Sequence, residues 1–222
     1  MTEAEAIMKR HSVRSYTDKQ IDSEVKTQLQ GFISRCNEES GLHIQLVCDE
    51  PKAFDCFMAH YGKFSGVKNY IALIGRKSAD FEEKCGYYGE KTALYAQTLG
   101  LNTCWVASSY SKAKGTYKVE AGEKLLMVLS LGYGATQGVA HKSKAAEKVS
   151  NITADSPKWF KDGVEAALLA PTAMNQQKFF FTLNGGKVAA KAGTGFYTKT
   201  DLGIAKYHFE VGAGKESFAW EK

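Results

Sequence analysis

Apolar positions repeat at helical spacing in two long stretches early in the chain. In the first stretch, positions 25, 29, 32, 33 and 36 share one face, Asp22 is placed to cap the start, and Gly41 follows the end. The second stretch covers residues 81–99 and is followed by Gly100, a residue that suits the left-handed position after a helix. Both stretches are therefore expected to be helices. A shorter helix is expected over residues 2–9, where Thr2 can cap the first turn.

Short continuous apolar runs, bounded by glycine or polar residues, predict strands. Runs of this length are typical of strands that are buried on both faces in a layered domain. The segment between the first two runs has a weaker, helix-like pattern. Helices and strands that alternate in this way indicate an α+β or α/β layered domain. The four predicted strands span residues 42–48, 69–75, 102–108 and 125–131.

A polar, alanine-rich crossing segment over residues 140–155 precedes a second series of helix, loop and strand. Ser156-Pro157 opens the helix, with proline at the first helical position, and Pro171 stops it. Residues 179–183 predict a strand that ends in a glycine-rich turn. A last helix is expected to begin with a cap at Thr200 or Asp201.

The composition is that of an ordinary globular protein, since 44% of the 222 residues are hydrophobic and 24% are charged. The net charge of +5 arises from scattered lysines rather than a basic cluster, so no nucleic-acid partner is expected. The five cysteines form no Cys-x-x-Cys pair, which argues against a zinc site and a disulfide framework. No apolar run approaches the ~20 residues that span a bilayer, and the first residues lack a signal-peptide pattern. We therefore expect a cytoplasmic protein without membrane contact.

Two segments carry the groups that a flat, phosphorylated ligand needs. Residues 10–16 hold two arginines, a histidine and serine hydroxyls, and guanidinium groups bind phosphate oxygens in a bidentate manner. Residues 170–177 form a loop of small residues broken by proline, in which Asn175 and Gln177 offer both donors and acceptors. Each segment alone is also explained as an ordinary solvated loop or turn.

Two further segments lie where a helix or strand ends. Residues 99–106 lead from the second long helix into a predicted strand, through Gly-Leu-Asn-Thr-Cys-Trp. Residues 131–134, Leu-Gly-Tyr-Gly, end another predicted strand and are followed by the basic run that begins at His141. Glycines at strand ends often mark a close approach of the backbone to a ligand. Taken singly, both segments are also explained as turns of a packed core.

Together, the four segments resemble the nitroreductase family of FMN-dependent flavoproteins. Its members begin with an Arg-Arg/His-Ser-x-Arg/Lys segment and carry a Pro-Ser-x-x-Asn-x-Gln loop, a Gly-Leu-x-x-Cys-Trp segment and a Gly-Tyr-Pro segment followed by basic residues. This chain has Thr172 for the serine, Gly134 for the last proline, and His141, Lys142 and Lys144 where an arginine is usual. The resemblance implies an α+β, nitroreductase-like layered fold with a central, mostly antiparallel sheet flanked by helices.

The resemblance also implies which residues bind the flavin and its phosphate. Because the isoalloxazine ring carries the redox chemistry, no catalytic side chain and no metal ion are expected. The expected cofactor-binding residues are Arg10, His11, Ser12, Arg14, Thr103, Trp105, Gly132, Tyr133, Lys142, Pro171, Thr172, Ala173, Met174, Asn175 and Gln177.

One departure from the family concerns the position of the Pro-Thr loop. In the family this loop follows the first long helix, and two subunits share each flavin. Here it follows the helix near residues 159–169 instead. We therefore expect residues 151–222 to be a shortened second copy that supplies the partner's loop in the same chain, similar to a monomer-like branch of the family. Residues 1–150 would then be the nitroreductase-like half with the phosphate-binding segment, and the protein would be a pseudo-dimeric monomer or a homodimer.

The activity that the resemblance implies is transfer of hydride from NADH or NADPH through flavin N5 to small acceptors. These acceptors are nitroaromatics, quinones or similar molecules, reduced by a ping-pong mechanism. Three alternatives remain open: a flavin-binding sensor or carrier without turnover, a dehalogenase or oxidase-like member of the same family, and a basic α/β domain that binds another phosphorylated ligand. The sequence does not decide between NADH and NADPH or identify the acceptor.

Overall fold

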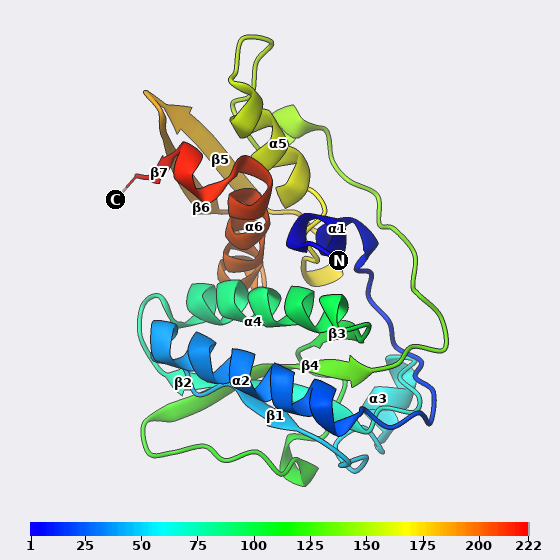
Figure 1. Cartoon of the computed structure of the whole chain (residues 1–222). Helices are drawn as coiled ribbons and strands as arrows, with labels where there is room; N and C mark the ends of the chain where they lie inside the picture. The colour runs from blue at the N-terminus through cyan, green and yellow to red at the C-terminus, as the bar shows by residue number, and fades with distance from the viewer. Residues whose placement is uncertain (222) are drawn as a thin grey trace.

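Four strands form the main sheet: β1 (Gln45–Val47), β2 (Asn69–Arg76), β3 (Asn102–Val106) and β4 (Glu123–Gly132). In the computed structural model, which describes residues 1–221, they lie in the order β1-β2-β4-β3 (Figure 1). Every neighbouring pair is antiparallel. The two central strands are buried along almost their whole length, as their continuous apolar runs predict.

Both faces of this sheet are covered, because successive side chains of β2 point to opposite sides. Ile71 and Leu73 pack in one core with α2 (Ser23–Ser40) and α4 (Phe81–Thr98). Tyr70 and Ile74 pack in a second core with the segment that contains α3 (Phe57–Tyr61). The short helix α1 (Glu3–Lys9) lies against α4 and against the C-terminal part of the chain.

The C-terminal part has its own small sheet and core. β5 (Phe179–Asn184) and β6 (Lys187–Ala192) form an antiparallel hairpin, and β7 (Ala219–Trp220) pairs with β6 in parallel. α5 (Lys158–Ala167) and α6 (Thr198–Ala213) pack against this sheet. Their core is rich in aromatic rings, namely Phe160, Phe181, Phe209, Phe218 and Trp220.

A long connection joins the two parts along one side of the molecule (Figure 1). It runs from the end of β4 to α5 and contains the 3₁₀ turn η2 (Ala146–Lys148). This path agrees with the crossing segment expected over residues 140–155. The remaining 3₁₀ turns are η1 (Lys112–Lys114), η3 (Ala173–Asn175) and η4 (Lys215–Ser217).

The predicted α+β fold with an antiparallel sheet flanked by helices is confirmed, and the local helix signals account for much of it. Thr2 caps α1 and forms a reciprocal capping box with Glu5. Asp22 occupies the N-cap position of α2, and Gly41 follows its end at φ 71°. Gly100 adopts φ 82° just after α4, the left-handed conformation predicted for it.

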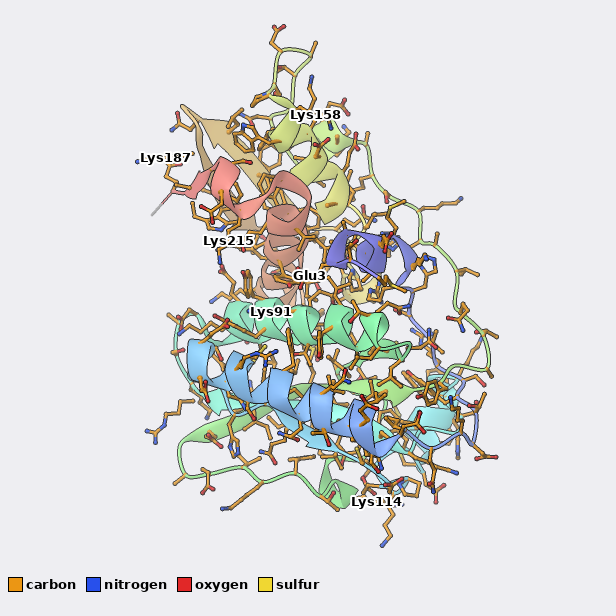
Figure 2. All side chains as sticks on the ribbon, in the orientation of Figure 1. Glu3, Lys91, Lys114, Lys158, Lys187 and Lys215 are labelled. Atoms are coloured by element: carbon orange, nitrogen blue, oxygen red, sulfur yellow. The ribbon has the colours of Figure 1, made fainter. Side chains whose placement is uncertain are left out.

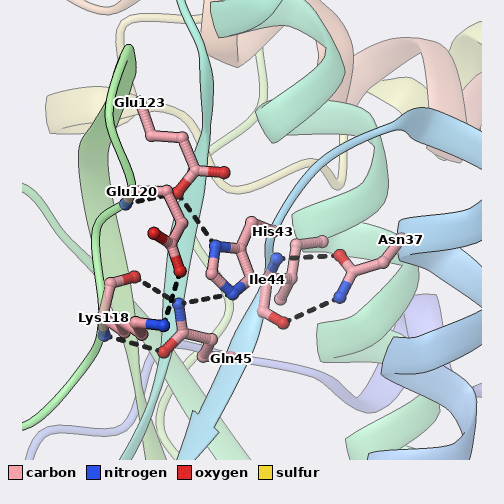
Figure 3. Close-up of polar contacts among 7 residues, drawn as sticks. All are labelled: Asn37, His43, Ile44, Gln45, Lys118, Glu120 and Glu123. Carbon is pink, nitrogen blue, oxygen red and sulfur yellow. Dashed lines mark hydrogen bonds and ion pairs between the residues drawn. The ribbon is translucent and has the colours of Figure 1, made fainter.

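β1 is shorter than the predicted strand over residues 42–48, and Figure 3 shows the polar contacts that hold the chain at its start. The side chain of Asn37, near the end of α2, donates to the Ile44 carbonyl at 2.9 Å and accepts from the Ile44 N–H at 2.8 Å. The N–H of His43 already donates to the carbonyl of Ile74 on β2 at 2.8 Å, so Asn37 anchors the backbone that leads into β1. His43 is held from the other side, with its Nδ1 atom 2.9 Å from Glu123 Oε2.

Three boundaries in the C-terminal part differ from the sequence predictions. Pro157 is the N-cap of α5 rather than its first helical residue, and α5 ends at Ala167, before Pro171. α6 begins at Thr198 with Tyr197 as N-cap, so Thr200 and Asp201 lie inside the helix and the predicted caps are wrong. β6 and β7 were not predicted, because alanine-rich and two-residue segments carry little strand signal.

The basic side chains are dispersed over the surface, as the sequence indicates. Figure 2 shows Lys91, Lys114, Lys158, Lys187 and Lys215 projecting from separate elements. The five cysteines have free thiols, and Cys36, Cys85 and Cys104 are buried. In the part of the chain that the structure describes, no helix has both the length and the apolar character needed to cross a bilayer.

Candidate functional site

A cavity of about 550 Å³ lies where the two parts of the chain meet. Its walls come from the segment after α1, from β3, from the loop after α5 and from the first turns of α6. The volume falls in the range of about 300–1,000 Å³ that is typical of small-molecule and cofactor sites. The lining residues are Ser12, Arg14, Cys104, Trp105, Val106, Ala107, Ser108, Met127, Pro171, Thr172, Ala173, Met174, Phe196, Tyr197, Thr200, Asp201 and Ile204.

The segment after α1 reaches the cavity by extending the main sheet at its β3 edge. Ser12 forms a parallel bridge with Thr103, and the N–H of Val13 donates to the Thr103 carbonyl at 3.1 Å. The hydroxyl of Tyr16 donates to the Val13 carbonyl at 2.7 Å and fixes the segment from the core side. As a result Ser12 and Arg14 are presented at the cavity wall.

Arg14 supplies the positive charge of the cavity. Its guanidinium carbon lies 5.7 Å from the centre of the Phe64 ring, a cation–π distance that orients the side chain. The side chain remains exposed, and none of the ion pairs among residues 1–221 uses it. A fixed, exposed guanidinium beside a serine hydroxyl is suited to bind a phosphate group.

The edge of β3 supplies backbone polar groups to the same cavity. Along a strand, the peptide groups of alternate residues point to the same side. Since the Thr103 carbonyl accepts from Val13 on the outer side, the peptide N–H of Trp105 also points outward, where Trp105 lines the cavity. The sheet edge therefore offers a donor to the polar edge of a bound heterocycle.

The loop after α5 forms the opposite wall and has an unusual backbone. Met174, Asn175 and Gln177 all have positive φ, at 50°, 53° and 44°, which is uncommon for residues other than glycine. Side chains bind its backbone amides: the N–H of Ala173 donates to Asp201 Oδ1 of α6 at 2.9 Å, and within the loop the N–H of Gln177 donates to Thr172 Oγ1 at 3.0 Å. The loop is thus a constrained structure rather than a free surface turn.

Asn175 and Gln177 face the long connection and do not line the cavity. The amide group of Asn175 donates to the carbonyl of Lys142 at 2.9 Å. Gln177 is buried, donates to the same carbonyl at 2.8 Å and accepts the N–H of Lys144 at 2.8 Å. Lys142 thus contributes its main-chain carbonyl to the support of the loop. These three predicted residues hold the cavity wall from behind.

Arg10 lies outside the cavity, buried against Glu90 of α4 with 3.4 Å between Arg10 Nε and Glu90 Oε1. Within the described residues, its Nε and Nη1 atoms have no hydrogen-bond partner, so the pair is an ionic contact rather than a directed hydrogen bond. The placement is reasonable, because a buried carboxylate needs a compensating charge. Neighbouring His11 packs closely against Gly138. Burial, together with Arg10 and His141, lowers the pKa of His11.

Thr103, Gly132 and Tyr133 do not line the cavity. Thr103 supplies the sheet-edge bridge to Ser12. A Cβ atom at Gly132 would lie 3.0 Å from the ring of Tyr16, so this position is tightly packed. The ring of Tyr133 lies 4.0 Å from Lys19 Nζ, and its carbonyl accepts the N–H of Thr17 at 2.8 Å. Of the predicted residues, the structure therefore brings together Ser12, Arg14, Trp105, Pro171, Thr172, Ala173 and Met174.

A buried polar network behind Trp105 could not be found from the sequence. The indole N–H of Trp105 donates to Glu90 Oε2 at 2.8 Å, and His208 Nε2 lies 2.9 Å from Glu90 Oε1. Burial would raise the pKa of Glu90, but the hydrogen bond from His208 and the charge of Arg10 bring that pKa below its ordinary value. Nothing in the sequence paired His208 with a carboxylate, because Glu90 is far away along the chain; the fold makes this pair.

Asp201 is the second functional candidate that the sequence did not identify, because there it was interpreted as a helix cap. It lines the cavity, is 2% exposed, and accepts hydrogen bonds from Ala173 and from Gln176. Burial raises the pKa of Asp201 to about 6, against the opposing effect of these two hydrogen bonds. The residue therefore holds an ionisable group at the base of the loop.

A protein family described as “Putative TM nitroreductase” matches residues 3–213 of the chain. No curated protein sequence matches it significantly. Among solved structures, a “putative nitroreductase” of Thermotoga maritima has a TM-score of 0.69 and 23% identity, and the match covers 97% of this chain and 85% of that one.

Two smaller proteins share the fold over part of the chain. A “putative nitroreductase in complex with FMN” of Desulfovibrio desulfuricans has a TM-score of 0.53 and 16% identity, over 71% of this chain and 98% of that one. A “Putative NADH dehydrogenase/NAD(P)H nitroreductase” of Parabacteroides distasonis has a TM-score of 0.51 and 19% identity, over 69% of this chain and 98% of that one. These likenesses concern the fold, whereas the family match extends over nearly all residues. The chain therefore belongs to the nitroreductase family.

Proposed function

We propose that the protein is an FMN-dependent oxidoreductase that takes hydride from NADH or NADPH and passes it to a nitroaromatic, quinone or similar acceptor by a ping-pong mechanism. One observation carries this proposal: the Arg14 segment and the Pro171–Met174 loop, which are far apart in sequence, line one cavity in a single chain. Family membership and the FMN complex of the Desulfovibrio desulfuricans protein support it.

The residues present fit such a cofactor. Arg14 and Ser12 form a cationic, hydroxyl-bearing end suited to a phosphate, and the remaining walls are mainly apolar, as a flat ring system requires. The outward N–H of Trp105 provides a donor for the polar edge of the ring. The hydroxyl of Thr200, which is buried at the cavity wall, has no hydrogen-bond partner among residues 1–221. An unsatisfied buried hydroxyl is consistent with a ligand that completes its hydrogen bonding.

The chain's own residues would bind, orient and shield. Ser12 and Arg14 would hold the phosphate, and the backbone of Pro171, Thr172 and Ala173 would lie along the ring. When bound, FMN would supply the hydride-accepting and hydride-donating chemistry at N5. Phe196 and Met174 are largely exposed beside the cavity, and their apolar side chains would limit the access of water to the ring.

We further propose that residues 151–222 are a shortened second copy of the first half, so that one chain builds one flavin site. The C-terminal part repeats the order of helix, loop and strand in α5, the Pro171 loop and β5. The coverage of the neighbours supports this proposal: nearly the whole Desulfovibrio desulfuricans chain matches 71% of this one, so this chain has additional residues. A single site per chain would not need a partner subunit to supply the loop.

The absorption spectrum of the purified protein, with identification of the chromophore released on denaturation, tests the proposal. We expect a flavin spectrum and about one FMN per chain. Rapid bleaching by NADH or NADPH and recovery on adding a quinone or nitro compound would establish turnover, whereas a bound flavin that stays oxidised would indicate a sensor or carrier. A protein that neither contains nor takes up FMN would contradict the flavin function.

A further inference from the structure

We propose that Asp201 is a positioning residue whose carboxylate holds the loop of residues 171–177 in its cavity-lining shape, and that taking up a proton weakens this hold. The proposal rests on the function proposed above, because the ligand that the loop contacts is taken to be FMN. It adds to that function a pH-sensitive control of the binding site by a residue outside the motifs of the sequence.

A single carboxylate joins two segments that border the cavity. Asp201 Oδ1 accepts the N–H of Ala173 at 2.9 Å, and Oδ2 accepts from Gln176 Nε2 at 2.7 Å. The same Nε2 group donates to the carbonyl of Phe196 at 2.8 Å. Because Asp201 belongs to the first turns of α6, these bonds connect the loop and the Phe196 segment to a rigid helix.

The loop needs this external support because its backbone is strained. Met174, Asn175 and Gln177 have positive φ, and residues of this kind persist only where their surroundings impose the conformation. Burial does not impose it on Met174, since 87% of that residue is exposed. The support on the far side comes from the long connection, through Asn175 and Gln177; the support on the cavity side comes from Asp201.

The two hydrogen bonds require the ionised carboxylate. A carboxylate accepts on both oxygens, whereas a protonated carboxyl group presents an O–H to one of the two donors, so one bond is lost. Asp201 is almost fully buried, and its pKa of about 6 places this change near neutral pH. With only one of the bonds to Ala173 and Gln176 left, Asp201 would hold the loop less firmly.

The other charged groups near Asp201 either bind different partners or make no hydrogen bond or ion pair to its carboxylate. Arg14 and Tyr197 line the same cavity without a hydrogen bond or ion pair to it in the described chain. On α4, which packs against α6, Glu83 is bound by Lys206 and Glu90 by His208. After the loop, Lys178 donates to the Thr194 carbonyl. The protonation of Asp201 is thus coupled mainly to the loop amides.

The first experiment follows the Ala173 amide proton by NMR in the cofactor-free protein between pH 4.5 and 8. Because this N–H donates directly to Asp201 Oδ1, its chemical shift should change with a midpoint near pH 6. The change should be absent in Asp201→Asn and retained in the control Asp162→Asn, which alters an exposed ion pair of α5. A flat Ala173 titration in the unaltered protein overturns the proposal, and this measurement needs neither FMN nor a variant.

The second experiment measures the dissociation constant of FMN at pH 5 and pH 7.5 by quenching of flavin fluorescence. The phosphate of FMN itself titrates near pH 6 and affects both proteins alike. The informative quantity is therefore the difference in FMN affinity between the unaltered protein and Asp201→Asn at each pH. We expect Asp201→Asn to bind FMN roughly tenfold more weakly at pH 7.5, as for a lost charge-assisted hydrogen bond, and to show a smaller pH effect. Equal affinities and equal pH effects in both proteins would overturn the proposal. If no protein binds FMN at any pH, the proposed function fails, and the Ala173 titration alone decides the role of Asp201.

Discussion

Gly203 of α6 lies directly against the backbone carbonyl of Glu83 of α4, with no room for a side chain between the two helices. The contact is reciprocal, because a side chain at Gly86 of α4 would meet the carbonyl of Thr200 on α6. The two helices therefore cross backbone to backbone. This crossing joins the two parts of the chain and fixes the position of Thr200 and Asp201 in the cavity wall.

Gly203→Ala should lower the free energy of unfolding by about 1–3 kcal/mol, because the added methyl group forces α4 and α6 apart. Gly31→Ala on α2 is the matched control. The site is exposed and open, so alanine should raise the free energy of unfolding there by about 0.5–1 kcal/mol through its better helix propensity. Urea unfolding of both variants measures the difference. Similar values for the two variants would show that the crossing tolerates a side chain.

Glu90→Ala should cost more than a typical core substitution. It removes the carboxylate that compensates Arg10 and accepts from Trp105 and His208, and loss of one partner of a buried ion pair costs about 3–5 kcal/mol. Chemical unfolding would show this loss, while Glu165→Ala at an exposed position of α5 should stay within about 0.5 kcal/mol of the unaltered protein. A mild effect of Glu90→Ala would mean that Arg10 finds another partner or reaches solvent.

Asp201 should make the protein less stable as the pH rises from about 4 to 6. The pKa of Asp201 is about 6 in the folded protein, against 3.8 for an exposed aspartate such as that of the unfolded chain. The folded state therefore binds more protons than the unfolded state in this pH range, and the free energy of unfolding falls as the pH rises. The contribution is at most about 3 kcal/mol. Across this range, the free energy of unfolding of Asp201→Asn minus that of the unaltered protein should rise with pH. Glu90 acts in the opposite direction, because its lowered pKa stabilises the fold at higher pH. A profile unchanged by Asp201→Asn would contradict the raised pKa.

The sequence predicted elements well wherever local signals decide them. Asp22 occupies the N-cap position of α2 without a side-chain cap hydrogen bond, and the left-handed Gly41 follows its end; both signals are local in sequence. The predicted start of α6 was wrong because the carboxylate of Asp201 binds the Ala173 amide of the loop instead of capping the helix. The local sequence pattern does not reveal a partner that lies this far away along the chain.

The candidate site was predicted in part for the same reason. The motifs predicted one site for Arg14 and the Pro171 loop, and both line one cavity in the structure. The sequence did not predict the direction in which two of the motif side chains point. Arg10 turns toward Glu90, and Asn175 turns toward the Lys142 carbonyl, because each partner comes from a distant segment. Which member of a motif faces the ligand therefore depends on the tertiary contacts that surround it.

Arg14→Ala should weaken FMN binding without destabilising the fold, and Arg10→Ala should do the reverse. Arg14 is exposed at the cavity, so its loss removes a charge-assisted phosphate contact of about 2–3 kcal/mol, or roughly 30- to 150-fold in the dissociation constant. Arg10 is buried against Glu90, so its loss leaves that carboxylate without a compensating charge. Flavin titration and urea unfolding of both variants separate the two roles, with the exposed Arg76→Ala as control. If Arg14→Ala binds FMN as tightly as the unaltered protein, the phosphate is held elsewhere, and the basic side chains near Lys142 become the next candidates.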